Sequence, residues 1–449
     1  MTSVFTKWEA GSVLLTDAGW GDSGKGKVAS ALTPDIGAKI IGGHNAGHTI
    51  ATDKGEFGLG LVPSTVIFPR TFNVLGQELV VNPFFLVDEI KKLNRGGIKI
   101  TSRNFMFDVR SHMILPWHEV RDALSEEARG TGAIGSLHLG VGWTYSDRVN
   151  RRGLRFIDLF ARDWKGRVEK ELGVQEAVIL EMRREVKRKT GKISKVKTEI
   201  GKRDLIKRLT KARTFLAPFA GNTIQVVWGA IEKKKRILFE GSHGAMLEVS
   251  HGSWPFTTGV NTALGAVHRS FGGKAVKSVN RIVTVVKAYQ TRVGGGPMPT
   301  EDFGKLGEFL QTRGGEVGTR SGRKRRCGPL DASLINYGLN VIGAGESDEI
   351  ALTKLDVLSG LKKIPVCVGY KFKGKVYRTT PRVDTEFLAK VKPVYKHLSG
   401  WEADITKVRN FKDLPANARK YVKFVSALLG RKITFIGVGK HKDAKILSF

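Results

Sequence analysis

The sequence predicts an α/β fold with a mainly parallel central sheet, and two patterns support this prediction. Short apolar runs typical of buried strands recur along the chain, and segments with helical spacing lie between them. A glycine-rich turn also joins the first of these runs to a helix, as in many nucleotide-binding proteins. We therefore expect three layers, with helices on both faces of the sheet and helical subdomains inserted.

Strands are expected where apolar residues stand together between turn signals. The first is 13–15, directly before the glycine-rich turn. The other expected strands are 79–81, 236–240, 282–286, 350–355, 366–368 and 433–438, with 105–107 as a weaker candidate. Helical spacing is found at 28–32, 89–93 and 118–128, whereas 130–142 is glycine-rich and reads as a loop. Two basic helices, broken near Gly191, are expected within 164–213.

The composition is that of a globular protein. The chain has 449 residues, of which 41% are hydrophobic and 26% are charged. Because no run of about 18 apolar residues is present, we expect no membrane span. The first ten residues lack an apolar signal core, and the two cysteines, Cys327 and Cys367, are too few for a disulfide framework. We therefore expect a cytoplasmic location, or the host cytoplasm if the chain is viral.

The formal net charge of +33 indicates anionic partners. These could be nucleic acids or several small anionic substrates. The densest basic block, 183–213, contains no aromatic residues, so it lacks the stacking platform of a single-strand binding surface. We expect no specific nucleic-acid partner.

Residues 19–27 read GWGDSGKGK and nearly match a phosphate-binding loop. Gly19, Gly24 and Lys25 have the expected spacing, but Gly26 stands where a serine or threonine would hold magnesium. Asp22 lies inside the loop, where its carboxylate could hold magnesium or accept a proton beside a bound phosphate. An ordinary glycine-rich turn is the alternative interpretation.

Residues 42–49 read GGHNAGHT, and together with 19–27 they resemble the opening of the adenylosuccinate synthetases. That family has a glutamate at the position of Ser23. Further matching segments follow in family order at 61–64, 151–155, 239–241, 251–255, 287–289, 291–294, 323–328 and 353–356. The resemblance implies a single catalytic domain over 1–449 with a basic helical insertion near 164–213. It also implies a homodimer.

The resemblance assigns catalytic roles to Asp22 and His48. The family phosphorylates O6 of a purine nucleotide with a nucleoside triphosphate, and the amine of L-aspartate then displaces phosphate at C6. Asp22 would take the N1 proton and bind Mg²⁺, and the carbonyl of Gly47 would complete the metal shell. His48 would stabilise charge on the transferred phosphoryl group.

The binding residues are also assigned by resemblance. Arg323 and Arg325 would hold the carboxylates of aspartate, since a guanidinium matches a carboxylate well. Residues 353–356 resemble the guanine-reading element of GTP-binding proteins, which favours GTP as donor but leaves ATP open. The nucleotide-binding residues would be Gly21, Gly24, Lys25, Gly26, Lys27, Thr353, Lys354, Asp356, Gly437 and Gly439. The remaining substrate-binding residues would be Ser23, Asn45, Ser136, Arg151, His243, Thr258, Arg292 and Val293.

Departures from the family pattern cluster around the acceptor nucleotide. Ser23 replaces a glutamate, His243 replaces a glutamine, and 136–139 replaces a stretch whose threonine holds the 5′-phosphate. A separate departure lies in the loop expected to hold aspartate, where Arg320 stands in place of a threonine. A mainly viral branch of the family aminates dGMP, and a serine at position 23 would leave room for the 2-amino group of guanine. We therefore expect dGMP as acceptor, with N6-succino-2-amino-2′-deoxyadenylate as product.

Two alternatives remain open. One is ordinary IMP-dependent adenylosuccinate synthesis with GTP. The other is a non-catalytic, basic nucleic-acid-binding protein, against which the retention of Asp22 and His48 argues.

Overall fold

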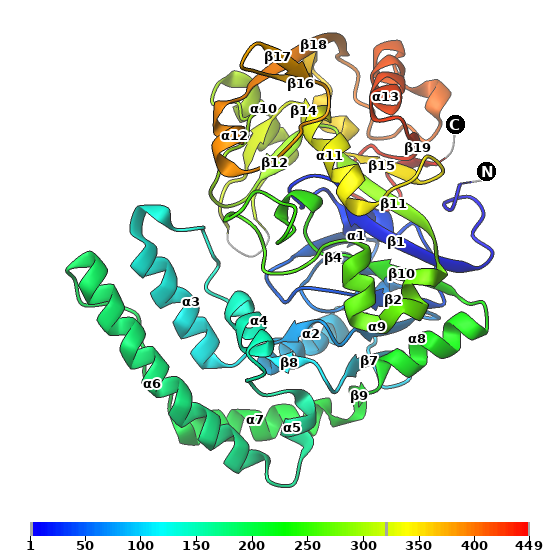
Figure 1. Ribbon diagram of the computed structural model, residues 1–449. Coiled ribbons are helices and arrows are strands. Elements are labelled where there is room, and N and C mark those ends of the chain that lie inside the picture. The colour runs from blue at the N-terminus through cyan, green and yellow to red at the C-terminus, as the bar shows by residue number, and fades with distance from the viewer. Residues whose placement is uncertain (1–2, 319–321, 448–449) are drawn as a thin grey trace.

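The computed structural model describes residues 3–318 and 322–447 and is built around one large sheet (Figure 1). Within these residues, ten strands form this sheet, and all neighbours pair in parallel except β19 and β20. In spatial order the strands are β20 (Lys445–Leu447), β19 (Lys432–Gly437), β15 (Glu349–Thr353), β11 (Val279–Lys287), β1 (Gly11–Asp17), β10 (Arg236–Glu240), β2 (Ile36–Lys39), β5 (Phe72–Leu75), β7 (Phe105–Asp108) and β9 (Ala220–Gly221). The predicted mainly parallel sheet is confirmed.

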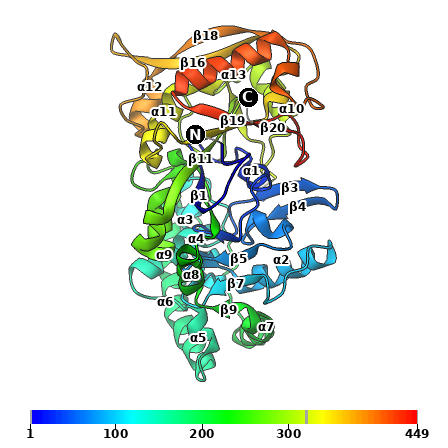
Figure 2. The same cartoon turned by 90° about the vertical axis from the view of Figure 1, so that its right-hand side faces the viewer.

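Smaller strand groups surround the large sheet. The hairpin of β3 (His48–Thr52) and β4 (Gly55–Leu59) projects on the same side as α1 and β20 (Figure 2). The other short pairs are β6 (Val80–Val81) with β8 (His112–Met113), and β12 (Gln290–Arg292) with β13 (Arg326–Gly328). A second sheet contains β14 (Leu330–Asp331), β16 (Leu361–Phe372), β17 (Lys375–Tyr377) and β18 (Lys392–Trp401).

Helices cover both faces of the large sheet, as the alternation of side chains along β1 shows. Leu14 packs into the apolar cluster that includes Phe271, whereas Val13 and Leu15 pack on the opposite face with Val28. The described helices are α1 (Lys25–Ala29), α2 (Pro83–Arg95), α3 (Pro116–Arg129), α4 (Val141–Val149), α5 (Phe156–Phe160), α6 (Trp164–Thr190), α7 (Lys202–Leu216), α8 (Thr223–Glu232), α9 (Leu264–Ser278), α10 (Lys305–Gly314), α11 (Ala332–Ile342), α12 (Thr385–Lys390) and α13 (Ala416–Leu429). None of these described helices is long and apolar enough to cross a membrane.

The two basic helices expected within 164–213 are α6 and α7. In Figure 1, α6 projects away from the sheet beside α3, and α7 returns along the bottom of the molecule toward β9. Gly191 ends α6 in the left-handed conformation, with φ of 71°, which a glycine adopts without strain. Buried leucines on α7, Leu205 and Leu209, join a cluster with Phe105 and Phe107 of the sheet. The apolar side of the basic pair is therefore buried in this cluster, where α6 packs on α3 and α7 packs on α2, and the lysines and arginines are left on the outside.

Some sequence expectations were wrong in detail. Strand 79–81 is the short β6, which pairs with β8 outside the large sheet, and 366–368 lies in β16, which pairs antiparallel with β18. An apolar run indicates a strand but does not say which strand will be its neighbour. The helix expected at 28–32 is α1, which begins at the phosphate-loop residue Lys25 and ends at Ala29. The loop expected over 130–142 ends where α4 begins at Val141.

Candidate active site

A cavity of about 1240 Å³ lies at the carboxyl ends of β1, β10 and β15. Ligand sites in open parallel sheets form at this edge because the loops that follow the strands meet there. Nineteen residues predicted from the sequence line this cavity: Gly21, Asp22, Ser23, Gly24, Lys25, Gly26, Lys27, Asn45, Gly47, His48, Ser136, His243, Thr258, Val293, Arg325, Thr353, Lys354, Asp356 and Gly439. The cavity thus gathers residues from nine separate parts of the sequence.

The phosphate loop between β1 and α1 depends on its glycines. Gly21 and Gly24 have φ of 82° and 91°, and a β-carbon on Gly21 would lie 3.3 Å from the backbone of His243. Asp22 also adopts a left-handed conformation, with φ of 56°. The ammonium of Lys25 is buried, where it donates to the carbonyl of His243 at 2.6 Å and lies 3.4 Å from Asp17 Oδ2. This part of the loop is therefore held rigidly against the sheet.

His48 is the first residue of β3, and a buried carboxylate orients its ring. His48 Nδ1 hydrogen-bonds to Oε1 of Glu240 at the end of β10, and Glu240 also accepts from the hydroxyl and the N–H of Ser64, each at 2.7 Å. Burial alone would raise the pKa of Glu240, but His48, Lys39 and Ser64 outweigh it and hold this pKa at about 2. Because the carboxylate accepts at Nδ1, His48 Nε2 is available to a ligand in the cavity. Ser64 and Glu240 were not predicted as site residues, although Glu240 is an acid at the end of an apolar strand.

Asp22 lies in the cavity beside Arg325. Its Oδ2 is 3.0 Å from Nη2 of Arg325, and Nη1 of Arg325 donates to Glu316 Oε2 at 2.7 Å. The Asp22 side chain keeps 33% of its surface exposed, so it remains accessible from the cavity. Nε of Arg325 is buried without a hydrogen-bond partner among the residues that the structure describes. One guanidinium thus connects the predicted base to a fully buried acid.

His243 is a neutral hydrogen-bond acceptor in the cavity wall. The Asn45 side-chain oxygen accepts from Gly43 N–H at 3.3 Å, so the Asn45 amide nitrogen faces His243 Nε2 at 3.2 Å. Nε2 therefore accepts, and the proton of the ring is on Nδ1, which is buried and finds no partner within 3–318 and 322–447. Burial and the nearby Lys25 lower the pKa of His243 to about 3, which keeps the ring neutral at pH 7.

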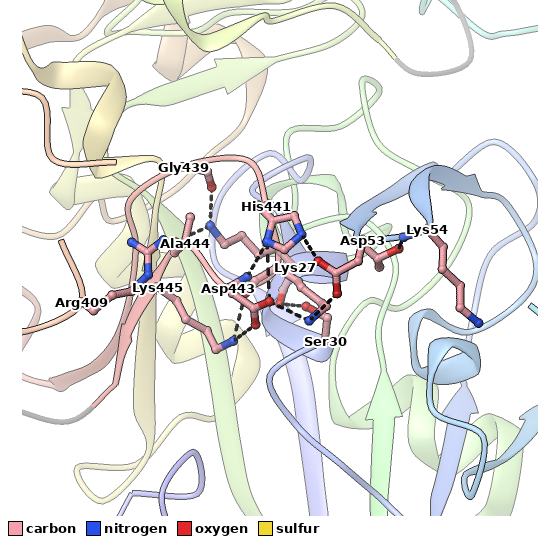
Figure 3. Close-up of polar contacts among 12 residues, drawn as sticks. Lys27, Ser30, Asp53, Lys54, Arg409, Gly439, His441, Asp443, Ala444 and Lys445 are labelled. Atoms are coloured by element: carbon pink, nitrogen blue, oxygen red, sulfur yellow. Dashed lines mark hydrogen bonds and ion pairs between the residues drawn. The ribbon is translucent and has the colours of Figure 1, made fainter. Parts of the chain in front are cut away.

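Asp356 and Lys27 lie together at the far end of the cavity. Burial raises the pKa of Asp356, and its Oδ1 is buried with no hydrogen-bond partner in the described part of the chain. Lys27 donates to the carbonyls of Gly439 and Ala444, the latter at 2.7 Å (Figure 3). Burial lowers the pKa of Lys27 to about 8. Lys27 therefore contacts the loop beyond β19 rather than the phosphate loop in which it stands.

Comparison with known proteins identifies the family. Residues 14–446 match the family model described as adenylosuccinate synthetase. The adenylosuccinate synthetase of Halothermothrix orenii is 38% identical over 439 residues, which cover 97% of this chain and 98% of that protein. The chain belongs to the adenylosuccinate synthetase family. It is therefore a carbon–nitrogen ligase.

Other relatives agree on this family. The adenylosuccinate synthetase of Carboxydothermus hydrogenoformans is 36% identical over 440 residues, covering 97% of this chain and 98% of that protein. The fully ligated adenylosuccinate synthetase of Plasmodium falciparum has a TM-score of 0.88 and 31% identity, covering 97% of this chain and 99% of that one. The cyanophage S-2L succinoaminodeoxyadenylate synthetase, bound to dGMP and dATP as an energy donor, has a TM-score of 0.60 and 15% identity, covering 98% and 96%. At this identity the phage enzyme shows a shared fold only.

Four residues that the adenylosuccinate synthetase pattern placed in the site lie outside the cavity. Arg151 is exposed, and Gly437 packs against the backbone of Thr353. Arg323 donates to the carbonyl of Gly135 at 3.2 Å and lines a neighbouring cavity of about 580 Å³. Arg320, which is not one of these four, lies outside the described residues.

The fourth residue, Arg292, is wholly buried in another role. Its guanidinium stacks 3.8 Å from the ring centre of Trp20 and donates to the carbonyl of Pro297 and to the Ser253 hydroxyl. Burial and the nearby Arg326 lower the pKa of Arg292 to about 9. Because its donors are used in the wall behind the phosphate loop, the structure does not bring Arg292 to the cavity.

Ser23 and Ser136 stand at positions that depart from the family pattern, and both donate their hydroxyl hydrogens to other groups of the protein. Ser136 donates to Asp122 at 2.9 Å, and Ser23 donates to the carbonyl of Gly21 at 3.3 Å. Each oxygen still has lone pairs that can accept a hydrogen bond from a ligand.

Proposed function

We propose that this enzyme joins L-aspartate to C6 of the purine nucleotide IMP, with GTP as phosphoryl donor. The observation that carries the proposal is one cavity that combines Asp22 beside Arg325, the His48–Glu240 pair and an oxygen of Asp356 that has no partner in the part of the chain that the structure describes. These groups match the base, the phosphoryl-stabilising imidazole, the aspartate clamp and the guanine acceptor that the reaction needs.

In the first step, the Asp22 carboxylate takes the proton from N1 of the purine. The electron pair moves onto O6, which attacks the γ-phosphorus of GTP, and GDP leaves. Because Nδ1–H is donated to Glu240, Nε2 of His48 must take up a proton before it can donate to the oxygens of the transferred group. The Glu240 carboxylate stabilises the resulting imidazolium, against the burial that lowers the pKa of His48. In the second step, the amine of aspartate attacks C6, the C6–O6 bond breaks, and phosphate leaves with the proton that the amine gives up. Arg325 is placed to hold a carboxylate of aspartate for this attack.

The donor set in the cavity fits Mg²⁺. The Asp22 carboxylate and the carbonyl of Gly47 are hard oxygen ligands, which magnesium prefers, and both residues line the cavity. When bound, Mg²⁺ would neutralise negative charge on the phosphates of the donor nucleotide. Asp22 would hold the ion from the cavity side of its carboxylate.

The base of the donor is inferred from Asp356. A buried carboxylate oxygen with no protein partner is costly, and the N1–H and 2-amino groups of guanine would satisfy it. Adenine has no donor pair in this arrangement, so the proposal favours GTP over ATP.

A second candidate acceptor is dGMP, and Ser23 is the observation that favours it. Ser23 lines the cavity, and its oxygen can accept a hydrogen bond from the 2-amino group that guanine has and hypoxanthine lacks. The product would then be N6-succino-2-amino-2′-deoxyadenylate. We place IMP first because the relatives at 36% and 38% identity are adenylosuccinate synthetases.

We also propose a homodimer. Arg151 is exposed and lies outside the cavity of its own chain. If Arg151 contacts the acceptor nucleotide, as the family pattern implies, it must do so in the site of a second copy.

Phosphate release that depends on aspartate tests these proposals. IMP, GMP and dGMP are each paired with GTP or ATP, and the products are identified by mass spectrometry. IMP with GTP is expected to be fastest. Preference for dGMP would establish the second candidate, and the absence of phosphate release with every acceptor would overturn the ligase chemistry proposed for this site.

A further inference from the structure

Glu316 is a fully buried carboxylate that the proposed chemistry does not use. Its Oε1 lies 3.0 Å from Lys287 Nζ and 2.7 Å from Lys354 Nζ, and it also accepts from the hydroxyl of Tyr289. Its Oε2 accepts from Arg325 Nη1 at 2.7 Å. Four donors therefore converge on one carboxylate, more than its role as a packed core residue requires.

These donors come from distant parts of the chain. Lys287 ends β11, and Tyr289 lies two residues later. Lys354 follows β15 within the segment that contains Asp356, and Arg325 precedes β13. Glu316 therefore touches both the base-reading segment and the arginine proposed to hold aspartate.

The backbone reinforces the contact with Arg325. The N–H of Arg325 donates to the carbonyl of Glu316 at 2.9 Å, and Val317 forms a bridge with Lys324. The N–H of Glu316 donates to Gln311 at the end of α10, also at 2.9 Å. The two ends of segment 316–325 are thus joined by main-chain and side-chain bonds at the same place.

The buried charge of Glu316 restricts the positions of its cationic partners. The side chains of Lys287 and Arg325 are 1% and 9% exposed, and that of Glu316 is fully buried. Burial would raise the pKa of Glu316, but Lys287, Lys354 and Arg325 hold it well below its usual range. Removal of one partner from a buried ion pair leaves an uncompensated charge. Each of the three cationic side chains is therefore held in contact with Glu316.

Lys354 shows what this contact does for the donor site. It has φ of 56°, a conformation that costs a non-glycine residue free energy, and its ammonium donates to Gly314 O at 2.6 Å as well as to Glu316. Asp356 follows two residues later. The contact with Glu316 thus stabilises the strained turn that presents Asp356 to the cavity.

We propose that Glu316 is a positioning residue that couples the base-reading segment to the aspartate-binding arginine, so that the two halves of the site form together. This rests on the proposed function for the roles of Arg325 and Asp356. Glu316 itself does not contact the reacting groups: its neighbours Gly315 and Val317 line the cavity, and its side chain points behind the wall.

The first test is Glu316→Gln, which keeps the shape of the side chain and removes its charge. The KM values for aspartate and for GTP are both expected to rise by at least about tenfold, because hydrogen bonds to charged groups are lost on both sides. Glu349→Gln is the matched control. Glu349 is also a buried carboxylate, but it binds Ser3 and Thr434 at the start of β15, whereas the cavity residues Thr353 and Lys354 lie at the other end of that strand. Both KM values are expected to stay within about threefold of wild type in this control.

A second pair of variants remains informative if Glu316→Gln does not fold. Lys354→Met removes only the donor-side contact of Glu316, and it is expected to raise the KM for aspartate as well as that for GTP. Asp356→Asn changes the base-reading group without touching Glu316, and it is expected to raise the KM for GTP alone. An unchanged KM for aspartate in both Lys354→Met and Glu316→Gln would overturn the proposal.

Binding measured without turnover separates this proposal from the proposed function. Calorimetric titration of GTP is expected to show about tenfold weaker binding to Glu316→Gln than to wild type or Glu349→Gln. Unchanged GTP affinity in a folded Glu316→Gln protein overturns the positioning role, whatever acceptor the wild-type enzyme uses. Absent phosphate release from wild type, with GTP binding that still depends on Glu316, overturns only the proposed reaction.

Discussion

The imidazole of His48 is held by the carboxylate of Glu240, which lies at the end of a different strand of the fold. The contact is made at Nδ1, so Nε2 is the ring nitrogen left for a ligand. Glu240 is fixed in turn by two hydrogen bonds from Ser64, both of 2.7 Å. The orientation of His48 is therefore set by the core of the sheet rather than by the hairpin that carries it.

We expect Glu240→Gln to lower kcat by about 100-fold with little change in KM, because the imidazolium that forms in the transition state loses its counter-charge. Steady-state kinetics with saturating substrates measures this effect. Glu349→Gln, which neutralises another buried carboxylate, serves as the control for a general loss of stability. A kcat within about threefold of wild type would contradict the role given to Glu240.

The lowered pKa of Glu240 predicts how the free energy of unfolding depends on pH. Its pKa is about 2 in the folded protein and near 4.5 without these contacts, so the unfolded state binds the proton more readily. The stabilisation is fully present above about pH 4.5 and is lost as the pH falls toward about 2. Denaturant unfolding of wild type and Glu240→Gln across this range measures it. The difference in unfolding free energy between the two proteins should shrink as the pH falls; a constant difference would show that the pKa of Glu240 is not lowered.

We expect Asp22→Ala to lower turnover by at least about 1000-fold, because no other acid stands in the phosphate loop to take the N1 proton. The fold should survive, since this side chain is partly exposed in the cavity. Phosphate release measures turnover, and circular dichroism measures the fold. Activity within about tenfold of wild type, about 1.4 kcal/mol of barrier, would contradict the assignment of Asp22 as the base.

The phosphate loop and the His48 motif could be predicted because their chemistry is local. Asp22 and the glycines beside it are neighbours in sequence, and the strand–turn–helix pattern places them at a helix start. Glu316 could not be found in this way. Its partners Lys287, Lys354 and Arg325 are separated by strands and helices, and no period or motif connects them.

Side-chain packing and strand pairing also determined features that the residue types alone did not predict. Arg292 was predicted to bind substrate because it lies in a matching segment, but its flat guanidinium stacks on Trp20 behind the loop. The antiparallel pairing of β16 with β18 was missed for a similar reason, since an apolar run does not specify its neighbour. The fold class was confirmed because apolar runs separated by helical segments indicate a sheet that is covered on both faces. Leu14 is buried on one face of the sheet, and Val13 and Leu15 are buried on the other.

We expect Asp356→Asn to raise the KM for GTP by about 30-fold or more, because a carboxylate oxygen that accepts from guanine becomes an amide donor. The same change should leave the melting temperature equal or higher. Burial raises the pKa of Asp356, so its charge destabilises the folded protein at pH 7. Kinetics with GTP and ATP and a thermal melt measure the two effects. Equal use of ATP and GTP by wild type, with no change in the variant, would show that Asp356 has only a structural role.

The acceptor is tested most directly at Ser23. A glutamate at this position, as in most of the family, would place a bulky anion where a 2-amino group could otherwise fit and would remove the short hydroxyl that can accept from it. Ser23→Glu is therefore expected to lower kcat/KM for dGMP much more than for IMP. One lost hydrogen bond accounts for about 0.5–1.5 kcal/mol, which is only a several-fold preference, so crowding must supply the rest. Ser30→Glu is the control, because Ser30 lies at the end of α1 and donates to Lys27 O at 2.6 Å. If wild type strongly prefers IMP and Ser23→Glu leaves the ratio of the two kcat/KM values unchanged, Ser23 has no part in the choice of acceptor.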